Sequence, residues 1–201
     1  MRFPEAITPA LAGGTSPTRR LMAGRLLACH DGSMRWAVET VANPRVLRLH
    51  TTEELTDHTI VTCPPALPPP PLDRLLALPE VQTLDLHRYR CRVNLRPGTN
   101  AIAVGHAAER SLLTAWGAPE PLPPQEEPRA FTIQREGPRV VAESREMARG
   151  DAVALALFEV QGVVEVVLGP GMTLVRLGRL FHWSAVQRDV VRALTLATGR
   201  P

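Results

Sequence analysis

An internal repeat constrains the fold of this chain more than any other feature of its sequence. When the sequence is shifted by 82 residues without a gap, residues 75–81 align with residues 157–163. Apolar residues continue to coincide further along: Leu84, Leu86, Val93 and Leu95 fall on Val166, Leu168, Val175 and Leu177. Alternating strands can resemble each other by chance, but the shared order of helix, turn and two strands favours a tandem duplication.

The repeat divides the 201 residues into two small domains. We predict a first repeat over residues 34–117 and a second over residues 129–201, after an N-terminal extension of residues 1–33. Residues 118–128 are rich in proline and short of apolar residues, which is typical of an extended interdomain linker. This linker, or the proline cluster at residues 64–71, is alternatively a ligand for an SH3-type partner.

Each repeat is predicted to be a small α+β unit. In the first repeat we expect strands at residues 35–39, 46–50, 81–86 and 89–95, and helices at residues 72–78 and near the end. The start of the second repeat matches at a slightly different offset, with Pro44, Leu47 and Leu49 aligned with Pro128, Phe131 and Ile133. The opening strand of the first repeat has no counterpart, because the sequence Gln-Glu-Glu at residues 125–127 stands in its place.

A helix is expected to close each repeat. Its apolar residues recur at a spacing of four, which places them on one stripe: Val104, Ala108, Leu112 and Trp116 in the first repeat, and Val186, Val190 and Leu194 in the second. Ser184 and Gln187 have the spacing of a capping box and predict where the second of these helices begins.

The outer face of the last strand differs between the repeats. Residues 88–95 alternate, so Arg88, Arg90, Arg92 and Asn94 share one face, and Tyr89, Cys91, Val93 and Leu95 share the other. The second repeat has Met172 and Leu174 at the positions of Arg90 and Arg92. The candidate interaction surface therefore consists of Arg88, Arg90, Arg92, Met172 and Leu174.

The two parts of this surface predict different ligands. A row of guanidinium groups suits phosphate, nucleic acid or an acidic partner, whereas Met172 and Leu174 suit another domain or chain. The alternatives are a solvated face with acidic neighbours for the Arg row, and cover by a helix or the other repeat for the apolar pair. The net charge of +3 and the absence of an aromatic platform on the Arg face argue against nucleic acid.

The residue types present exclude several chemistries. All 23 basic residues are Arg, which excludes a Schiff-base lysine and a phosphate-loop lysine. The three Cys are far apart and form no C-x-x-C pair, and the six His are scattered, so no metal or cofactor site is predicted. The carboxylate pairs Glu53–Glu54 and Glu126–Glu127 fall in predicted loops, where we expect ordinary pKa values. We therefore predict no catalytic residues.

Both repeats resemble a known domain. Residues 38–49 read V-E-T-V-A-N-P-R-V-L-R-L and are similar to the opening pattern E-x-T-P-N-P-x-T-L-K-F of the N-terminal domain of Nfu/NifU-type scaffold proteins. In the second repeat, residues 155–163, residues 169–175 and Trp183 resemble the later segments of that domain, L-F-x-I-P-G-V, G-x-D-F-I-T-V and a tryptophan. The chain is thus similar to two tandem copies of the domain.

This resemblance implies an antiparallel sheet with helices packed on one face, and an association with iron–sulfur cluster biogenesis. In Nfu scaffolds a C-x-x-C pair in a separate C-terminal domain holds the cluster, and this chain has no such pair. We therefore expect a cytoplasmic, non-catalytic interaction or accessory module with a protein partner, such as an iron–sulfur assembly factor. No apolar run is long enough to span a membrane.

Two other functions remain open from the sequence. One is the binding of an anion or nucleic acid through the face that carries Arg88, Arg90 and Arg92. The other is iron binding or a role as a cluster assembly scaffold.

Overall fold

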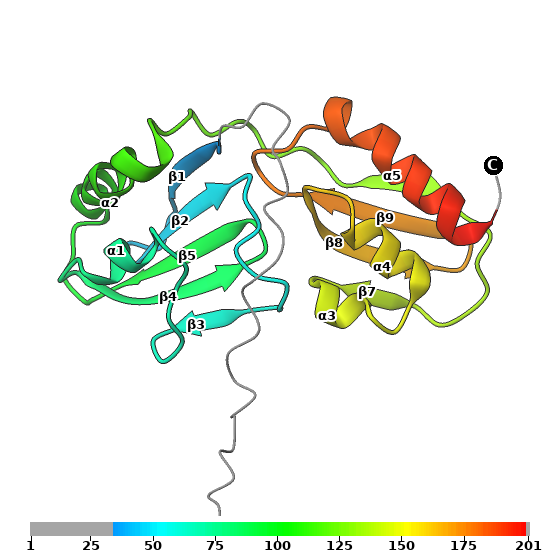
Figure 1. Cartoon of the computed structure of the whole chain (residues 1–201), viewed down its shortest axis with the longest axis horizontal. Coiled ribbons are helices and arrows are strands. Elements are labelled where there is room, and N and C mark those ends of the chain that lie inside the picture. Colours follow the sequence, from blue (N-terminus) through cyan, green and yellow to red (C-terminus); the bar gives the residue numbers. More distant parts are fainter. Residues whose placement is uncertain (1–33, 200–201) are drawn as a thin grey trace, which may run out of the picture. The chain divides into compact units, whose positions relative to one another are not determined.

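The computed structural model describes residues 34–199, so the extension predicted at residues 1–33 lies outside the described residues. The described residues belong to one compact unit that contains two antiparallel β-sheets, of five and four strands, together with helices (Figure 1). The predicted α+β class, with two small antiparallel sheets, is confirmed.

The first repeat forms the five-stranded sheet. Its strands are β1 (Trp36–Thr40), β2 (Val46–Thr51), β3 (Val61–Cys63), β4 (Val81–His87) and β5 (Arg90–Leu95), in the spatial order β1-β2-β5-β4-β3. The helices α1 (Asp73–Leu76) and α2 (Ala101–Trp116) cover one face of the sheet (Figure 1). The predicted stripe on α2 lies in the core, because Val104, Ala108 and Leu112 are buried against the sheet and Trp116 is partly buried.

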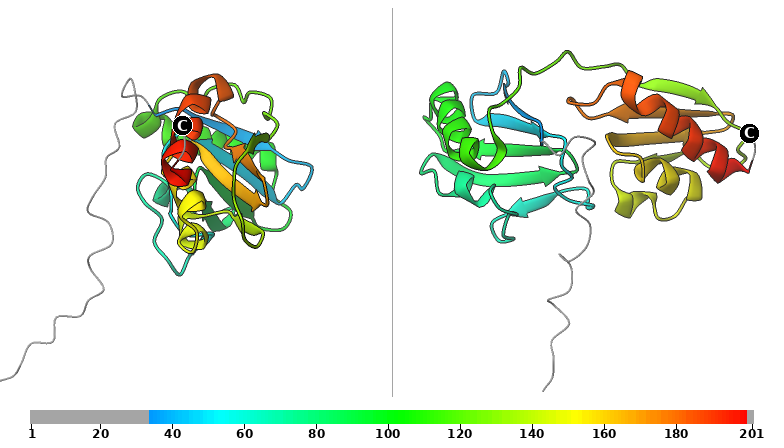
Figure 2. Two further views of the ribbon diagram at one scale, coloured as in Figure 1. Left: turned by 90° about the vertical axis from the view of Figure 1, so that its right-hand side faces the viewer. Right: turned by 45° about the horizontal axis from the view of Figure 1, so that its top comes forward.

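The second repeat forms the four-stranded sheet. Its strands are β6 (Arg129–Thr132), β7 (Val140–Ala142), β8 (Val163–Gly169) and β9 (Met172–Leu177), in the order β6-β9-β8-β7. Its helices are α3 (Arg145–Ala148), α4 (Ala152–Phe158) and α5 (Trp183–Thr198). In the two views of Figure 2, α4 and α5 lie across the same face of this sheet, and they pack against each other. The short strands β3 and β7 were not expected from the sequence.

The structure repeats with the same period as the sequence. The strands β8 and β9 and the helix α5 each begin 82 residues after β4, β5 and α2, respectively. The pairing register shifts at equivalent points, between Val81 and Thr83 in the first repeat and between Val163 and Glu165 in the second. A β-bulge at the same position in both sheets indicates that the two repeats share one backbone design rather than a similar strand composition.

The different offset expected for the first matching strand is wrong. Leu49 of β2 pairs with Cys91 of β5, and Phe131 of β6 pairs with Thr173 of β9. Because Thr173 follows Cys91 by 82 residues, Phe131 is the counterpart of Leu49, and Ile133 is not. Side chains in a strand alternate with a period of two, so a shift by two residues preserves the apolar pattern and cannot be detected from it.

Residues 118–128 form neither a helix nor a strand, yet they are held by both repeats. The backbone N–H of Glu120 donates to the carbonyl of Trp36 at 2.8 Å, and the side chain of Arg179 donates to the carbonyl of Pro123 at 2.7 Å. Gln125 Nε2 donates to the carbonyl of Leu177 at 3.3 Å, at the end of β9. The segment is therefore anchored along its length.

The capping box predicted at Ser184 and Gln187 is wrong. The N-cap of α5 lies two residues earlier, at His182, so the helix begins at Trp183, and His182 makes no side-chain cap. Instead Glu126 Oε2 accepts a hydrogen bond from the backbone N–H of Trp183 at 2.8 Å, and Oε1 lies 3.0 Å from His182 Nδ1. The Trp183 N–H, followed by His182, lowers the pKa of Glu126 below 4.5. The ordinary pKa expected for this carboxylate is thus also wrong.

We expect Glu126→Ala to lower the free energy of unfolding at pH 7 by about 1 kcal/mol, the typical value of a helix N-cap. The folded-state pKa of Glu126 is depressed, so its contribution is present above the unfolded pKa and disappears as the pH falls through the folded value. In urea denaturation the difference from the parent chain should therefore be largest at pH 7 and shrink as the pH is lowered towards 3. Glu127→Ala is the matched control, and an equal loss in that variant would contradict the capping role.

Candidate anion-binding cavity between the two repeats

A cavity of about 300 Å³ is lined by residues of both repeats. The first repeat contributes His50 from β2 and residues 87–90 from the turn between β4 and β5, and the second contributes Arg176 and Arg179. The lining contains four Arg side chains but only two carboxylates, Glu143 and Glu165. The volume lies at the lower end of the range for small-molecule sites, which suits a ligand no larger than a small organic anion.

Arg90 is the least neutralised cation in this lining. It is half-buried at the start of β5, and within residues 34–199 its side chain forms no hydrogen bond or ion pair. Burial, and then the charges of Arg48 and Arg92, lower the pKa of Arg90, and the carboxylates of Glu39 and Glu143 partly offset these effects. A partly desolvated guanidinium without an acceptor is a favourable partner for an incoming anion.

The pKa values of the two cavity histidines are both lowered, by burial and by the neighbouring arginines. Burial, and then the charge of Arg90, lower the pKa of His87 to about 4. Burial also lowers the pKa of His50, although Glu39 Oε2 lies 3.0 Å from its Nε2. Both imidazoles are therefore neutral at pH 7, and each already shares a hydrogen bond, His50 with Glu39 and His87 with the backbone of Thr59.

Two arginines of the second repeat complete the basic lining. Arg176 Nε contacts Glu165 Oε2 at 2.7 Å, so this pair is internally neutralised. Arg179 donates to the carbonyl of Pro123 through Nη2, while its Nε is buried without a hydrogen-bond partner among the described residues. An unpaired buried donor costs free energy that an anion in the cavity would recover.

Arg88 does not belong to an exposed row, which corrects the predicted surface. It lies in the turn that precedes β5, and only 2% of its side chain is exposed. Its guanidinium donates to the carbonyls of Phe158 and Val163, each at 2.6 Å, and Nε donates to Glu54 Oε1 at 3.1 Å. Arg88 is thus occupied by contacts that join the repeats, and it is not available to an external partner.

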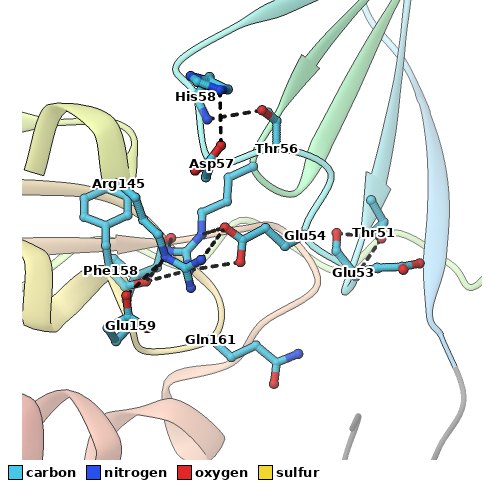
Figure 3. A network of polar contacts seen from close by, with 12 residues as sticks. Thr51, Glu53, Glu54, Thr56, Asp57, His58, Arg145, Phe158, Glu159 and Gln161 are labelled. Carbon is cyan, nitrogen blue, oxygen red and sulfur yellow. Dashed lines mark hydrogen bonds and ion pairs between the residues drawn. The ribbon is translucent and has the colours of Figure 1, made fainter. Parts of the chain in front are cut away.

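The carboxylate of Glu54 is shared by two arginines from different repeats. Arg145 Nη1 contacts Glu54 Oε1 at 3.3 Å, and Arg145 Nε donates to the carbonyl of Phe158 at 3.3 Å (Figure 3). The Arg88 guanidinium also lies over the rings of Tyr89 and Phe158, at 5.0 and 5.2 Å from their centroids. Glu54 lies in a loop, as predicted, but its carboxylate is partly buried and paired with both arginines.

Tyr89 extends this junction into the second repeat. It packs with the second repeat's core, and its ring centroid lies 4.8 Å from that of Phe181. The expectation that Tyr89 shares a sheet face with Cys91, Val93 and Leu95 is wrong, because the turn redirects residues 88–89 away from the first core. The tip of the β4–β5 hairpin therefore packs between the two repeats.

The other members of the predicted surface lie apart from the cavity. Arg92 is exposed on the outer face of β5, opposite Arg48 of β2 and Asp85 of β4. Met172 is 52% exposed, and Leu174 is half-buried on the outer face of β9. Of the five residues, only Arg88 and Arg90 line the cavity.

Cysteine and histidine positions give no metal centre in the described part of the chain. No group of three or more His, Cys, Asp or Glu side chains that could hold a metal ion occurs there. Cys63 and Cys91 are buried in the first core, and burial raises the pKa of both thiols.

The residues that complete the cavity were missed by sequence reasoning. His50, His87 and the neighbouring pair Arg176 and Arg179 lie in separate parts of the chain and follow no common spacing. They converge only when the hairpin tip of one repeat docks on the other. The only sequence signal for this cavity was the repeat. At the 82-residue offset it places Arg176 at the position of Asn94, on the outer face of the equivalent strand.

Searches against protein-family models, curated proteins and solved structures give no match. Among the described helices, none combines the length and apolar character needed to cross a bilayer.

Proposed function

We propose that this protein is a non-catalytic binding module that takes an anionic group, a carboxylate or a phosphate, in the cavity between its repeats. The observation that carries the proposal is Arg90, a half-buried cation with no acceptor among residues 34–199. The unpaired Nε of Arg179 supports it independently, and the depressed pKa of His87, which burial and then the Arg90 charge lower, is consistent with it. An anion would neutralise the Arg90 charge and accept a hydrogen bond from the unpaired Nε of Arg179.

The chemistry of the lining favours binding over catalysis. Its hydroxyl groups are those of Thr59 and Tyr89. The Thr59 hydroxyl is hydrogen-bonded to Ser144 Oγ at 3.1 Å, and burial raises the pKa of the Tyr89 phenol. Among the described residues, neither hydroxyl is hydrogen-bonded to an imidazole or carboxylate that could act as its general base.

The resemblance of both repeats to the Nfu N-terminal domain adds a biological setting to the proposal. We infer an accessory role beside iron–sulfur assembly factors, in which the module recognises an anionic partner rather than holding a cluster. The duplicated topology supports this inference, because the site requires both repeats.

The pKa of His87 provides a direct test of anion binding. In chloride buffer the His87 imidazole should titrate near pH 4, and inorganic phosphate or citrate should raise that pKa, because a bound anion favours the imidazolium. The titration can be followed by NMR of the imidazole ring. Competition between the two anions at one site separates phosphate from carboxylate recognition.

Arg90→Ala should raise the pKa of His87 in chloride and abolish any further rise with phosphate or citrate. Arg92→Ala is the matched control, since Arg92 is on the same strand but does not line the cavity. Equal weakening by both variants would instead indicate diffuse attraction to the strand face. No shift with either anion in the parent chain would overturn the proposal.

A further inference from the structure

The second repeat has an open sheet edge at the place where the first repeat has a strand. In the first repeat β1 pairs with β2, but β6, the counterpart of β2, pairs only with β9 among the described strands. The backbone N–H of Ile133 donates to the carbonyl of Gly171 at 3.1 Å, on the β9 side. Because backbone groups alternate along an antiparallel strand, those of Ala130 and Thr132 point to the open edge.

A groove of about 930 Å³ runs along this edge, between β6 and α5. Its lining includes the apolar side chains of Phe131, Ile133, Val191 and Leu194, together with polar and charged residues such as Arg135 and Glu136. Val191 is exposed although its side chain is apolar. Unpaired backbone groups beside a groove that holds apolar side chains are the two features that strand addition requires.

The first repeat shows what fills the equivalent space. Trp36 of β1 pairs with Thr51, the counterpart of Ile133, and its side chain is completely buried. Its ring centroid lies 5.8 Å from that of Trp116, the counterpart of Thr198. The groove is therefore the site that a tryptophan-bearing strand occupies in the first repeat.

We propose that β6 accepts an extended strand of a partner protein, antiparallel to it, with an aromatic side chain opposite Ile133 and a small side chain opposite Phe131. The aromatic requirement follows from Trp36. The small residue is required by α5. In the first repeat Gly105 of α2 leaves room for Val38 of β1. The counterpart of Gly105 on α5 is Gln187, whose larger side chain contacts Arg129. The strand thus carries the pattern aromatic-x-small.

The charge pattern of the bound strand also differs from that of β1. In the first repeat, Glu39 of β1 contacts Arg48 and His50 of β2. The counterparts of these two residues in β6 are Ala130 and Thr132, which are uncharged. The bound strand consequently needs no acidic residue at the position of Glu39.

Neither a second copy of β6 nor residues 1–33 offer a strand with this pattern. Two β6 strands paired with each other would place Ile133 opposite Phe131, where a small side chain is needed. In residues 1–33 the only Phe, Trp or Tyr is Phe3, which is followed by Pro4 and Glu5 and does not match the pattern. A strand from another protein is therefore the occupant that the groove fits.

This inference does not depend on the proposed anion site. The groove and the cavity share no lining residue, so either can fail without the other.

A peptide of the protein's own β1 sequence tests the proposal with the full chain. The probe is M-R-W-A-A-E-T-V, residues 34–41 with Val38→Ala, and calorimetry should show saturable binding with one site per chain. We expect Trp36→Ala in this peptide to weaken binding by about tenfold or more. The peptide that keeps Val38 should also bind more weakly than the probe.

Variants of the protein locate the binding edge. Ala130→Pro removes an edge-facing donor while leaving the β9 ladder intact, and it should weaken peptide binding by about tenfold or more. Ala130→Ser is the matched control and should bind as the parent does. Val191→Glu places a charge in the groove from an exposed position and should weaken binding without unfolding the chain.

Three outcomes would overturn the proposal. The first is no saturable binding of the peptide to the parent chain. The second is strong protection of the Ala130 and Thr132 amides from hydrogen exchange in the free monomer, which would place the chain's own residues on the edge. The third is a dimer in sedimentation that Ala130→Pro dissociates, which would make a second molecule the occupant.

Discussion

An Arg88→Met variant is expected to lose about 3 kcal/mol of unfolding free energy, because it removes one partner of a buried, charge-assisted network. The methionine would leave the carbonyls of Phe158 and Val163 without their donors and would remove one of the two guanidinium groups that neutralise Glu54. Each such loss is costly, since the remaining group stays buried without its hydrogen bond.

The same variant should weaken the coupling between the repeats. Arg88 belongs to the first repeat, whereas both of its carbonyl acceptors belong to the second. Urea unfolding followed by circular dichroism and by tryptophan fluorescence should coincide for the parent chain and separate for the variant. Arg88→Lys should recover only part of the loss, because an ammonium group cannot reproduce the planar fork that reaches three acceptors.

Arg92→Met is the matched control for Arg88→Met, since Arg92 is exposed on the adjoining strand, and we expect a change within about 0.5 kcal/mol. A loss below about 1 kcal/mol for Arg88→Met would show that the repeats are held together mainly by other contacts.

Gly162→Ala is expected to cost about 3 kcal/mol, from backbone strain and overpacking together. Gly162 has a φ of +93°, and an added Cβ would lie 2.6 Å from both Cγ and Cδ1 of Phe181. The ring cannot easily move because it packs on Tyr89, and the Gly162 carbonyl accepts from the N–H of Gly178 at 2.8 Å.

Gly171→Ala separates the two causes. Gly171 also has a positive φ, of +73°, but no atom lies within 4 Å of its added Cβ, so only the backbone cost of about 1 kcal/mol remains. Thermal or urea unfolding should therefore rank the variants in that order. Equal losses would mean that Phe181 moves aside without cost and that the junction around Tyr89 is loosely packed.

Strand and helix patterns in the sequence predicted most of the fold. The repeat of 82 residues and the stripe on α2 are local or periodic features, and each has a direct counterpart in the structure. The short strands β3 and β7 were not predicted, because three residues are too few to show alternation.

The candidate surface was predicted less well than the fold. Alternation placed Arg88 and Tyr89 on the strand with Arg90, but the strand begins at Arg90 and the two preceding residues form the turn. A turn residue is oriented by what it packs against, and here that is the other repeat. The same reason explains Glu126, whose partner at Trp183 is distant in the sequence.

The sequence alone was sufficient to establish two α+β repeats with a common period, because apolar spacing reflects which side of each element faces its own core. The tertiary structure alone decided which polar residues meet: Arg88 with Glu54, Glu126 with the start of α5, and Arg90 with the arginines of the second repeat. Hydrogen bonds and charge contacts act over a few ångströms between residues that are remote in the chain, so no periodicity records them. The docking of one repeat on the other therefore determines both the cavity and the loss of Arg88 as a surface residue.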